Sequence, residues 1–256
     1  MLFIDTHSHI FLPEFDNDRN EVIKRAFENG IKKIILPNVD SSTIDPLLAL
    51  EKKYPNNCFP LIGLHPTSVK EGFESELKIV KNWVNKKIFY GIGEIGIDLY
   101  WDKTYKKQQI IAFENQIELA KKNNLPIIIH SRESFPEIFN IMDNQADNNL
   151  KGIFHAFSGN IEQAEKAISY GFKLGIGGIV TFKNSGLDKV IEQINIENLV
   201  LETDSPYLAP VPKRGKRNES SYIIYIAQKI SEIFKIDIEQ VAEITSKNTM
   251  EIFKFV

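Results

Sequence analysis

Residues 89–130 carry the pattern that decides the fold. Two short runs, FYGIGEIGID at 89–98 and PIIIH at 126–130, are apolar almost throughout. Such runs are typical of parallel strands that are covered on both faces. Between them, apolar side chains recur at steps of three and four residues, at Ile110, Phe113, Ile117 and Ala120. That spacing predicts a helix over 105–124, so the whole stretch predicts a strand–helix–strand unit with parallel strands.

The same alternation continues over the rest of the chain. Six further apolar runs predict strands at 3–9, 32–39, 58–65, 151–157, 172–180 and 199–204. Amphipathic stretches predict helices at 18–29, 42–54, 75–86, 134–146, 160–170, 184–194, 219–234 and 237–254. This α/β pattern predicts a (β/α)8 TIM barrel, with residues 1–256 forming a single domain. An open doubly wound sheet is the alternative, and the lack of a GxGxxG motif after the first run disfavours it.

Composition and charge narrow the class of protein. The 256 residues are 43% apolar and 25% charged, with a formal net charge of −3, which disfavours a nucleic-acid coat protein. No apolar run approaches the ~20 residues of a membrane helix, and the first residues lack the pattern of a secretory signal. The single cysteine, Cys58, excludes an internal disulfide and an all-cysteine metal site. We therefore expect a cytoplasmic protein without membrane association or an obligate protein partner.

Ionisable residues gather at the ends of the predicted strands. All five histidines lie there, His7, His9, His65, His130 and His155. The fourth and eighth runs add four carboxylates, Glu94, Asp98, Glu202 and Asp204. One such histidine is more often a hydrogen-bonded structural residue, and one such glutamate could pair with a lysine or arginine. Chance does not gather so many costly buried groups at one barrel face, so the set predicts a metal site.

The first run, FIDTHSH, ends in two histidines two places apart. Side chains alternate along a strand, so His7 and His9 share a face. Two imidazoles on one side form a natural chelate for a divalent transition metal. Because the eighth strand of a closed barrel lies beside the first, Asp204 is expected to reach the same place.

The order of short motifs along the chain is specific. HxH is followed by GxHP, GEIGID, HSR, FHAFSG, ETDSPYL and RGKRN, between Asp5 and Asn218. This order and spacing resembles that of the TatD family of metal-dependent hydrolases and deoxyribonucleases. The resemblance implies a barrel of the amidohydrolase type, in agreement with the strand count. One departure is that Ser220 and Ser221 stand where a proline is expected, at a helix start that accepts either residue type.

The resemblance also implies two divalent ions. Their ligands would be His7, His9 and Asp204 for one ion, His130 and His155 for the other, and Glu94 between the two. Glu94 would take the place of the carboxylated lysine that bridges the metals in related barrels, and His65 would lie close to the metals. The mixed nitrogen and oxygen ligands suit Zn²⁺ or Mn²⁺ better than Mg²⁺.

Two of these carboxylates, Glu94 and Asp204, are predicted to be catalytic. In a two-metal site a shared water loses a proton, and the resulting hydroxide attacks phosphorus in line. Asp204 is the candidate to orient that water and move its proton. Glu202 either supports a metal ligand from behind or is a buried structural acid.

Cations near the predicted metal face indicate a phosphate-bearing substrate. The loop after the eighth run contains four of them, Lys213, Arg214, Lys216 and Arg217. Loops in this position often hold phosphate, although a solvated basic loop is the alternative. Arg132 is a further candidate that could instead pair with Glu133. Aromatic residues near the same rim could stack on bases or only pack, namely Tyr100, Trp101 and Phe157.

We therefore expect a metal-dependent phosphodiester hydrolase. The resemblance implies a 3′-to-5′ exonuclease that acts on single-stranded DNA or on a 3′ end. The same site suits attack on a carbonyl, so an amidohydrolase, an esterase or an aminoacyl-tRNA deacylase is the first alternative. A barrel kept as a binding protein is the second, and the complete set of candidate ligands argues against it.

Overall fold

The computed structural model describes residues 2–255. Within this range the strands are β1 (Phe3–Asp5), β2 (Ile31–Leu36), β3 (Cys58–Pro60), β4 (Ile92–Asp98), β5 (Ile127–Arg132), β6 (Gly152–Phe154), β7 (Lys173–Ile176) and β8 (Leu199–Leu201). The helices are α1 (Arg19–Glu28), α2 (Ile44–Lys53), α3 (Phe73–Val84), α4 (Lys106–Asn123), α5 (Phe135–Gln145), α6 (Ile161–Ser169), α7 (Leu187–Ile191), α8 (Ile223–Phe234) and α9 (Ile238–Ile252).

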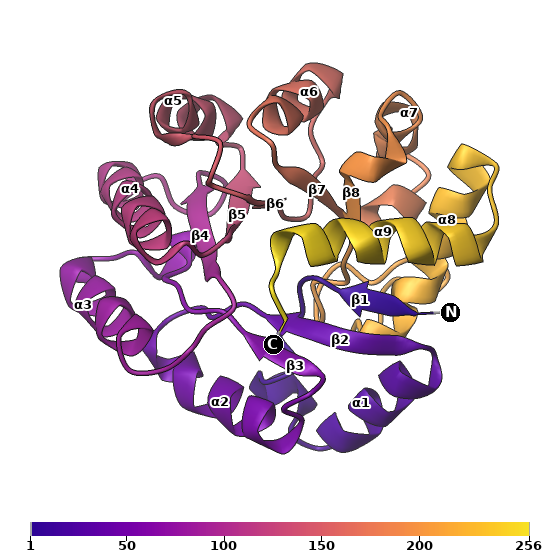
Figure 1. The fold of residues 1–256 in the computed structure, drawn as a ribbon, viewed down its shortest axis with the longest axis horizontal. Coiled ribbons are helices and arrows are strands. Elements are labelled where there is room, and N and C mark those ends of the chain that lie inside the picture. Colours follow the sequence, from indigo (N-terminus) through magenta and orange to yellow (C-terminus); the bar gives the residue numbers. More distant parts are fainter. Residues whose placement is uncertain (1, 256) are drawn as a thin grey trace.

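The strands close into a barrel with helices around it (Figure 1). β1–β3 form one parallel sheet and β4–β8 form another. At one junction Gly93 N donates to Ile62 O at 2.9 Å. At the other, the seam between the first and last strands, Thr6 N donates to Leu201 O at 3.0 Å. The closed ring of parallel strands confirms the predicted (β/α)8 barrel.

Most helices lie within a few residues of their predicted positions, and the largest difference is at α7. The sequence predicts a helix over 184–194, whereas α7 spans only Leu187–Ile191. Gly186 has a left-handed backbone with φ of +70°, which interrupts any helix that would begin before it. The helix predicted at 219–234 likewise begins as a 3₁₀ turn, Ser220–Tyr222, before α8.

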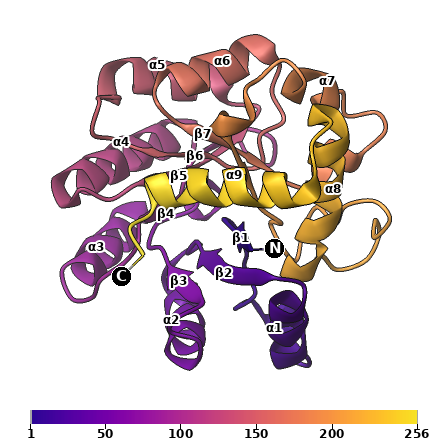
Figure 2. The same ribbon diagram turned by 45° about the vertical axis from the view of Figure 1, so that its right-hand side comes forward.

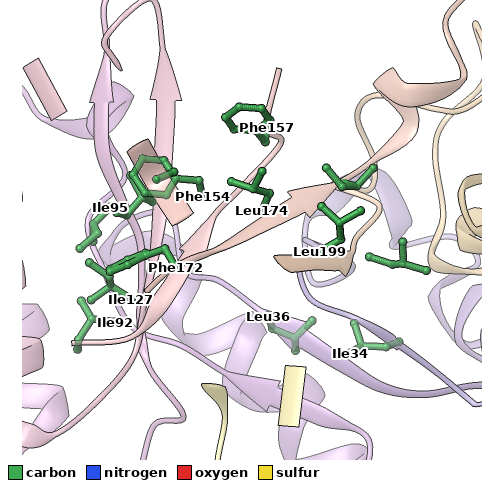
Figure 3. Packing of buried hydrophobic residues seen from close by; sticks show 14 of the residues in the cluster. Ile34, Leu36, Ile92, Ile95, Ile127, Phe154, Phe157, Phe172, Leu174 and Leu199 are labelled. Atoms are coloured by element: carbon green, nitrogen blue, oxygen red, sulfur yellow. The ribbon is translucent and has the colours of Figure 1, made fainter. Parts of the chain in front are cut away.

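Alternating side chains divide the core into an outer and an inner layer. The outer layer fills the space between strands and helices. In Figure 3, Phe154 of β6 and Phe172 lie beside Ile95 of β4 and Ile127 of β5. The two phenylalanine rings have their centroids 5.7 Å apart, an edge-to-face arrangement that aromatic pairs favour.

The inner layer is apolar at one end of the barrel and polar at the other. Three of its buried apolar residues are Ile128, Ile153 and Val200, and each precedes a predicted site residue by two positions. Because side chains two apart point to the same side, His130, His155 and Glu202 also point into the barrel. The strands therefore place an apolar floor beneath an ionisable upper layer.

The C-terminal helix closes the apolar end. α9 packs against β1 and β8 and runs across the barrel in Figure 2. The residues that end it, Ile252 and Phe253, join the inner apolar cluster with Ile35 and Phe59. Across residues 2–255, every helix falls short of the length or apolarity that a membrane span requires.

Truncating this floor should destabilise the barrel. Phe253 is 1% exposed, so Phe253→Ala should lower the free energy of unfolding by about 3–5 kcal/mol through lost burial and a cavity. Met250→Ala on the same helix, where the side chain is 52% exposed, should change it by less than about 0.5 kcal/mol. Urea unfolding of both variants measures the difference, and equal losses would contradict the assigned floor.

Candidate metal centre

Glu94 of β4 lies at the centre of the histidine cluster. Its side chain is 3% exposed, and Oε2 lies 3.0 Å from His7 Nε2 and 3.6 Å from His9 Nε2. Oε1 lies 2.8 Å from His130 Nδ1 and 3.4 Å from His65 Nε2. The two carboxylate oxygens therefore face two different groups of imidazoles.

Asp204 and His155 complete the cluster. Asp204 Oδ1 lies 3.7 Å from His7 Nε2, 3.6 Å from His9 Nε2 and 3.8 Å from His155 Nε2. His155 Nε2 is also 3.7 Å from Glu94 Oε1, and its ring stacks on that of His7 with centroids 3.4 Å apart. The structure thus brings together all six residues that the sequence predicts as metal ligands.

Three of these residues lie on the two sides of the seam between β1 and β8. The Nε2 atoms of His7 and His9 are 3.0 Å apart, as strand alternation requires. Asp204 N donates to His7 O at 2.8 Å. Asp204 has a left-handed backbone with φ of +56°, a conformation that aspartate tolerates better than most residues. Behind them, the buried Asp5 accepts hydrogen bonds from Thr203 N at 3.0 Å and Thr203 Oγ1 at 2.7 Å.

Asp98, at the end of β4, orients His130. Its Oδ2 lies 2.9 Å from His130 Nε2, while its Oδ1 accepts hydrogen bonds from Tyr100 N and Trp101 N. The imidazole is therefore held between two carboxylates. Burial alone would lower the pKa of His130, but the bonds to Asp98 and Glu94 raise it to about 9. The sequence places Asp98 at a strand end but assigns it no role.

Glu202 orients His155 from the opposite side. Its Oε1 lies 2.9 Å from His155 Nδ1 and accepts a hydrogen bond from Ala156 N at 2.7 Å. Burial alone would lower the pKa of His155, but the charges of Glu202, Glu94 and Asp204 raise it to about 10. A Cβ at Gly175 of β7 would collide with Glu202 Oε2, so this glycine makes the room that the carboxylate occupies.

Burial and neighbouring charges shift the pKa values of the cluster, in some residues in opposite directions. Burial and the neighbouring His155 hold the pKa of His7 well below its usual value. Burial raises the pKa of Glu94, but the charges of His7, His65 and His155 outweigh it and hold that pKa well below its usual range. Burial raises the pKa of Asp204 to about 6. Ionised carboxylates buried among imidazoles favour binding of a cation, because the cation would neutralise their charge.

The donor atoms fit divalent transition metals. They lie within 4.8 Å of one another in three groups: His7, His155 and Asp204; His7, His9 and Glu94; and His65, Glu94 and His130. Imidazole nitrogen and carboxylate oxygen are ligands that Zn²⁺ and Mn²⁺ accept. Two of the groupings differ from those expected, because His65 joins Glu94 and His130 while His155 joins His7 and Asp204.

The cluster lies in a cavity of about 600 Å³ at the polar end of the barrel. Arg132 and Trp101 line its rim. The Arg132 guanidinium lies 3.9 Å from the Tyr100 ring centroid and 5.3 Å from that of Trp101. Within residues 2–255 Arg132 forms no ion pair, because Glu133 pairs with Lys103 instead, at 3.7 Å. A cation without an ion-pair partner in the described residues and one exposed aromatic ring, Trp101, therefore border the cavity.

The structure does not bring every predicted substrate contact to this cavity. Phe157 is only 2% exposed and packs on Phe135 with centroids 5.7 Å apart, so of its two expected roles it has the packing role and does not stack on bases. Arg214 lies over the Phe182 ring. Lys216 and Arg217 line a different cavity, because Arg217 is bound to Asp18 at 2.7 and 2.9 Å.

The two serines that follow this loop take structural roles. Ser220 Oγ lies 3.4 Å from Ser8 Oγ, close to the seam. Ser221 Oγ donates to Glu219 Oε1 at 2.6 Å. Both residues belong to the 3₁₀ turn that opens α8, so a proline is not needed to begin this helix.

Comparison with known proteins agrees with this geometry. A family model described as TatD related DNase matches residues 4–254. The chain belongs to the TatD family. The uncharacterized metal-dependent hydrolase YabD of Bacillus subtilis is 38% identical over 255 residues, covering 99% of each chain. The family and its named relatives identify the protein as a metal-dependent hydrolase.

Two other relatives cover nearly the whole chain. The 3′-5′ ssDNA/RNA exonuclease TatD of Erwinia amylovora is 27% identical over 246 residues, 94% of this chain and 95% of that protein. The crystal structure of the TatD homolog YjjV of Escherichia coli matches with a TM-score of 0.93 at 28% identity, covering 99% of this chain and 98% of that one. The second match supports the closed (β/α)8 barrel.

Filling the space beside Glu202 should weaken metal binding. Gly175→Ala should displace the Glu202 carboxylate and release His155, lowering the affinity for Zn²⁺ or Mn²⁺ by about 10–100-fold. Gly177→Ala is the matched control, since a Cβ there would lie 3.6 Å from Glu202 Oε1, an ordinary contact. Calorimetric titration with each metal measures the affinity. Wild-type affinity in Gly175→Ala would show that Glu202 does not support the centre.

Proposed function

We propose that the protein is a metal-dependent phosphodiester hydrolase that removes nucleotides from the 3′ end of single-stranded DNA. One observation carries this proposal. The same cavity contains Glu94, whose two carboxylate oxygens face different groups of imidazoles, and Arg132, which forms no ion pair within residues 2–255. The first suits a pair of divalent cations, and the second suits a phosphate anion. The exonucleases named TatD in Erwinia amylovora and Pectobacterium parmentieri, both 27% identical to this chain, support the same reaction class.

The residues of the cluster would hold two divalent ions, of which Zn²⁺ and Mn²⁺ fit best. His7, His9 and Asp204 would bind one ion, and His130 and His155 the other, since both of the latter face Glu94 Oε1, at 2.8 and 3.7 Å. Glu94 would lie between them because each of its oxygens faces one group. When bound, such ions acidify water and neutralise the charge that develops on the phosphate oxygens.

Asp204 is the proposed proton acceptor. Its Oδ1 lies within 3.8 Å of His7, His9 and His155, so its carboxylate stands where it could orient an attacking water and take its proton. Its left-handed backbone and the hydrogen bond from its N to His7 O fix the carboxylate over the cluster. Strain of this kind is retained where the surrounding structure requires one conformation.

The rim would select a single-stranded end. Arg132 would bind the phosphate beside the scissile bond, and Trp101, which is 69% exposed, would stack on the terminal base. A cavity of about 600 Å³ is of the size that holds a small ligand. One unpaired nucleotide fits that description, whereas a base-paired duplex end does not.

Cleavage of end-labelled DNA tests the proposal. A 5′-labelled single-stranded oligonucleotide should yield a ladder that shortens from the 3′ end with Mn²⁺ or Zn²⁺ and stays intact with chelator. Glu94→Gln should lower the rate by at least about 100-fold because it removes the shared negative charge. Glu133→Gln, an exposed glutamate on the same face, should match the wild-type rate.

Each other outcome of that assay assigns a different function. Folded protein that holds ions but cuts no DNA, and that hydrolyses an ester, an amide or an aminoacyl-tRNA, would replace the nuclease with the carbonyl hydrolase considered above. Binding of DNA without hydrolysis of any substrate would indicate a binding protein. Either result would contradict the proposal.

The stacking role of Trp101 has its own test. Trp101→Ala should raise KM for single-stranded DNA by about 5–100-fold, the equivalent of one lost base–aromatic stack, with a smaller change in kcat. Trp101→Phe should restore most of the affinity because it keeps an aromatic face. Steady-state kinetics on one oligonucleotide separates the two constants. A KM equal to that of wild type in Trp101→Ala would place the base elsewhere.

A further inference from the structure

A second cavity of about 590 Å³ lies between α1, the loop after β8 and the start of α8. Four cations line it, Arg25, Lys213, Lys216 and Arg217. The turn that opens α8 packs against α1, so segments from both ends of the chain form its walls (Figure 2). Three of these cations belong to the basic loop that the sequence places over the metals.

The two arginines of this cavity are fixed by ion pairs. Arg25 donates to both oxygens of Glu219, from Nε at 3.1 Å and from Nη2 at 2.6 Å. Arg217 donates to both oxygens of Asp18. Bidentate pairs hold a guanidinium in one orientation. The arginines therefore form rigid walls.

The two lysines are positioned without a compensating acid. Lys213 Nζ lies over the rings of Tyr222 and Tyr225, 5.2 and 5.8 Å from their centroids. Neither Lys213 nor Lys216 forms an ion pair with any residue in the range 2–255. The four cations thus face only the carboxylates of Glu219 and Asp18, in a chain whose formal net charge is −3. A concave, locally positive surface of this kind favours an anion.

The loop after β8 lines both this cavity and the metal cavity. Tyr207 lines the metal cavity, and its carbonyl accepts a hydrogen bond from Asn218 Nδ2 at 2.6 Å. Asn218 directly follows Arg217, which lines the second cavity. Asn218 N also donates to Pro206 O at 2.9 Å. An extended anion bound along this loop would therefore contact residues of both cavities.

We propose that the second cavity binds backbone phosphates of a single-stranded nucleic acid whose 3′ end lies in the metal cavity. This inference rests on the proposed function and adds a second contact for the same substrate. Lys213 and Lys216 act as point charges for phosphate oxygens, and the arginines, neutralised by Glu219 and Asp18, shape the walls of the cavity. Because such contacts read no base, the site tolerates any sequence.

Binding in the presence of a chelator tests the site without cleavage. The probe is a fluorescein-labelled oligothymidylate of about 20 nucleotides, longer than a typical single-strand binding site. Lys213→Ala/Lys216→Ala should weaken binding by about tenfold and reduce the slope of log K against log salt by about 1.4, or ~0.7 for each lost phosphate contact. The matched control is Lys78→Ala/Lys122→Ala, which removes the same charge from the groove between α3 and α4 and should leave binding unchanged.

Two results would overturn the inference. One is an unchanged salt slope and affinity in Lys213→Ala/Lys216→Ala. The other is equal competition by inorganic phosphate at the same phosphate concentration, which would indicate a site for the free anion and not for a strand. Both lysines are partly or fully exposed and form no ion pair within residues 2–255, so the substitutions should leave the fold intact.

Kinetics then separates this inference from the proposed function. With metal added, the lysine variant should raise KM for the oligonucleotide by about tenfold and leave hydrolysis of bis-p-nitrophenyl phosphate unchanged, because that diester occupies only the metal cavity. If the lysine variant has the wild-type KM for both substrates, the proposed second site is wrong and the proposed nuclease function is unaffected. If the variant loses oligonucleotide binding and the wild type cleaves no DNA, the proposed nuclease function is wrong, and the second cavity is an anion-binding site only.

Discussion

The structure of this site depends on one buried carboxylate. Glu94 presents one oxygen to His7 and His9 and the other to His65 and His130. A carboxylate buried in this way is costly unless positive charge surrounds it. His130 and His155, whose pKa values are raised, supply positive charge, and divalent cations would supply it more strongly. Residues on four different strands or strand ends converge on this one side chain, so the site requires the closed barrel.

Support for the centre comes from a surrounding shell of residues. Asp98 fixes His130, and Glu202 fixes His155, each through the ring nitrogen that faces away from the cluster's other donors. Gly175 provides the room for Glu202. Such supporting contacts set the orientation of a metal ligand as firmly as the ligand's own strand does. The orientations of His130 and His155 therefore depend on Asp98 and Glu202, two carboxylates that would not themselves bind the ions.

The sequence predicts much of this architecture because its signals are local and periodic. Alternation along each strand predicts both the apolar floor and the convergence of His7 with His9. The short α7 is harder to predict, because Gly186 acts through its backbone conformation and not through a hydrophobic pattern. The role of Asp98 depends on the orientation of the His130 ring, whose Nε2 meets Asp98 while its Nδ1 meets Glu94, and a sequence pattern does not predict a ring orientation. Likewise, the basic loop is drawn away from the metals by Asp18, a residue nearly two hundred positions earlier in the chain, and no local pattern reveals such a partner.

The position of the centre across the seam has a consequence for folding. Ser8 and Ser205, which bond across the seam at 2.6 Å, are 197 positions apart in the chain. The neighbouring donors His7, His9 and Asp204 can meet only after the first and last strands have paired. Contacts between such distant segments form late, since long loops must close first. An ion bound there would hold the first and last strands together. Because the ion binds only the closed barrel, the stability of the folded protein would rise with the concentration of metal.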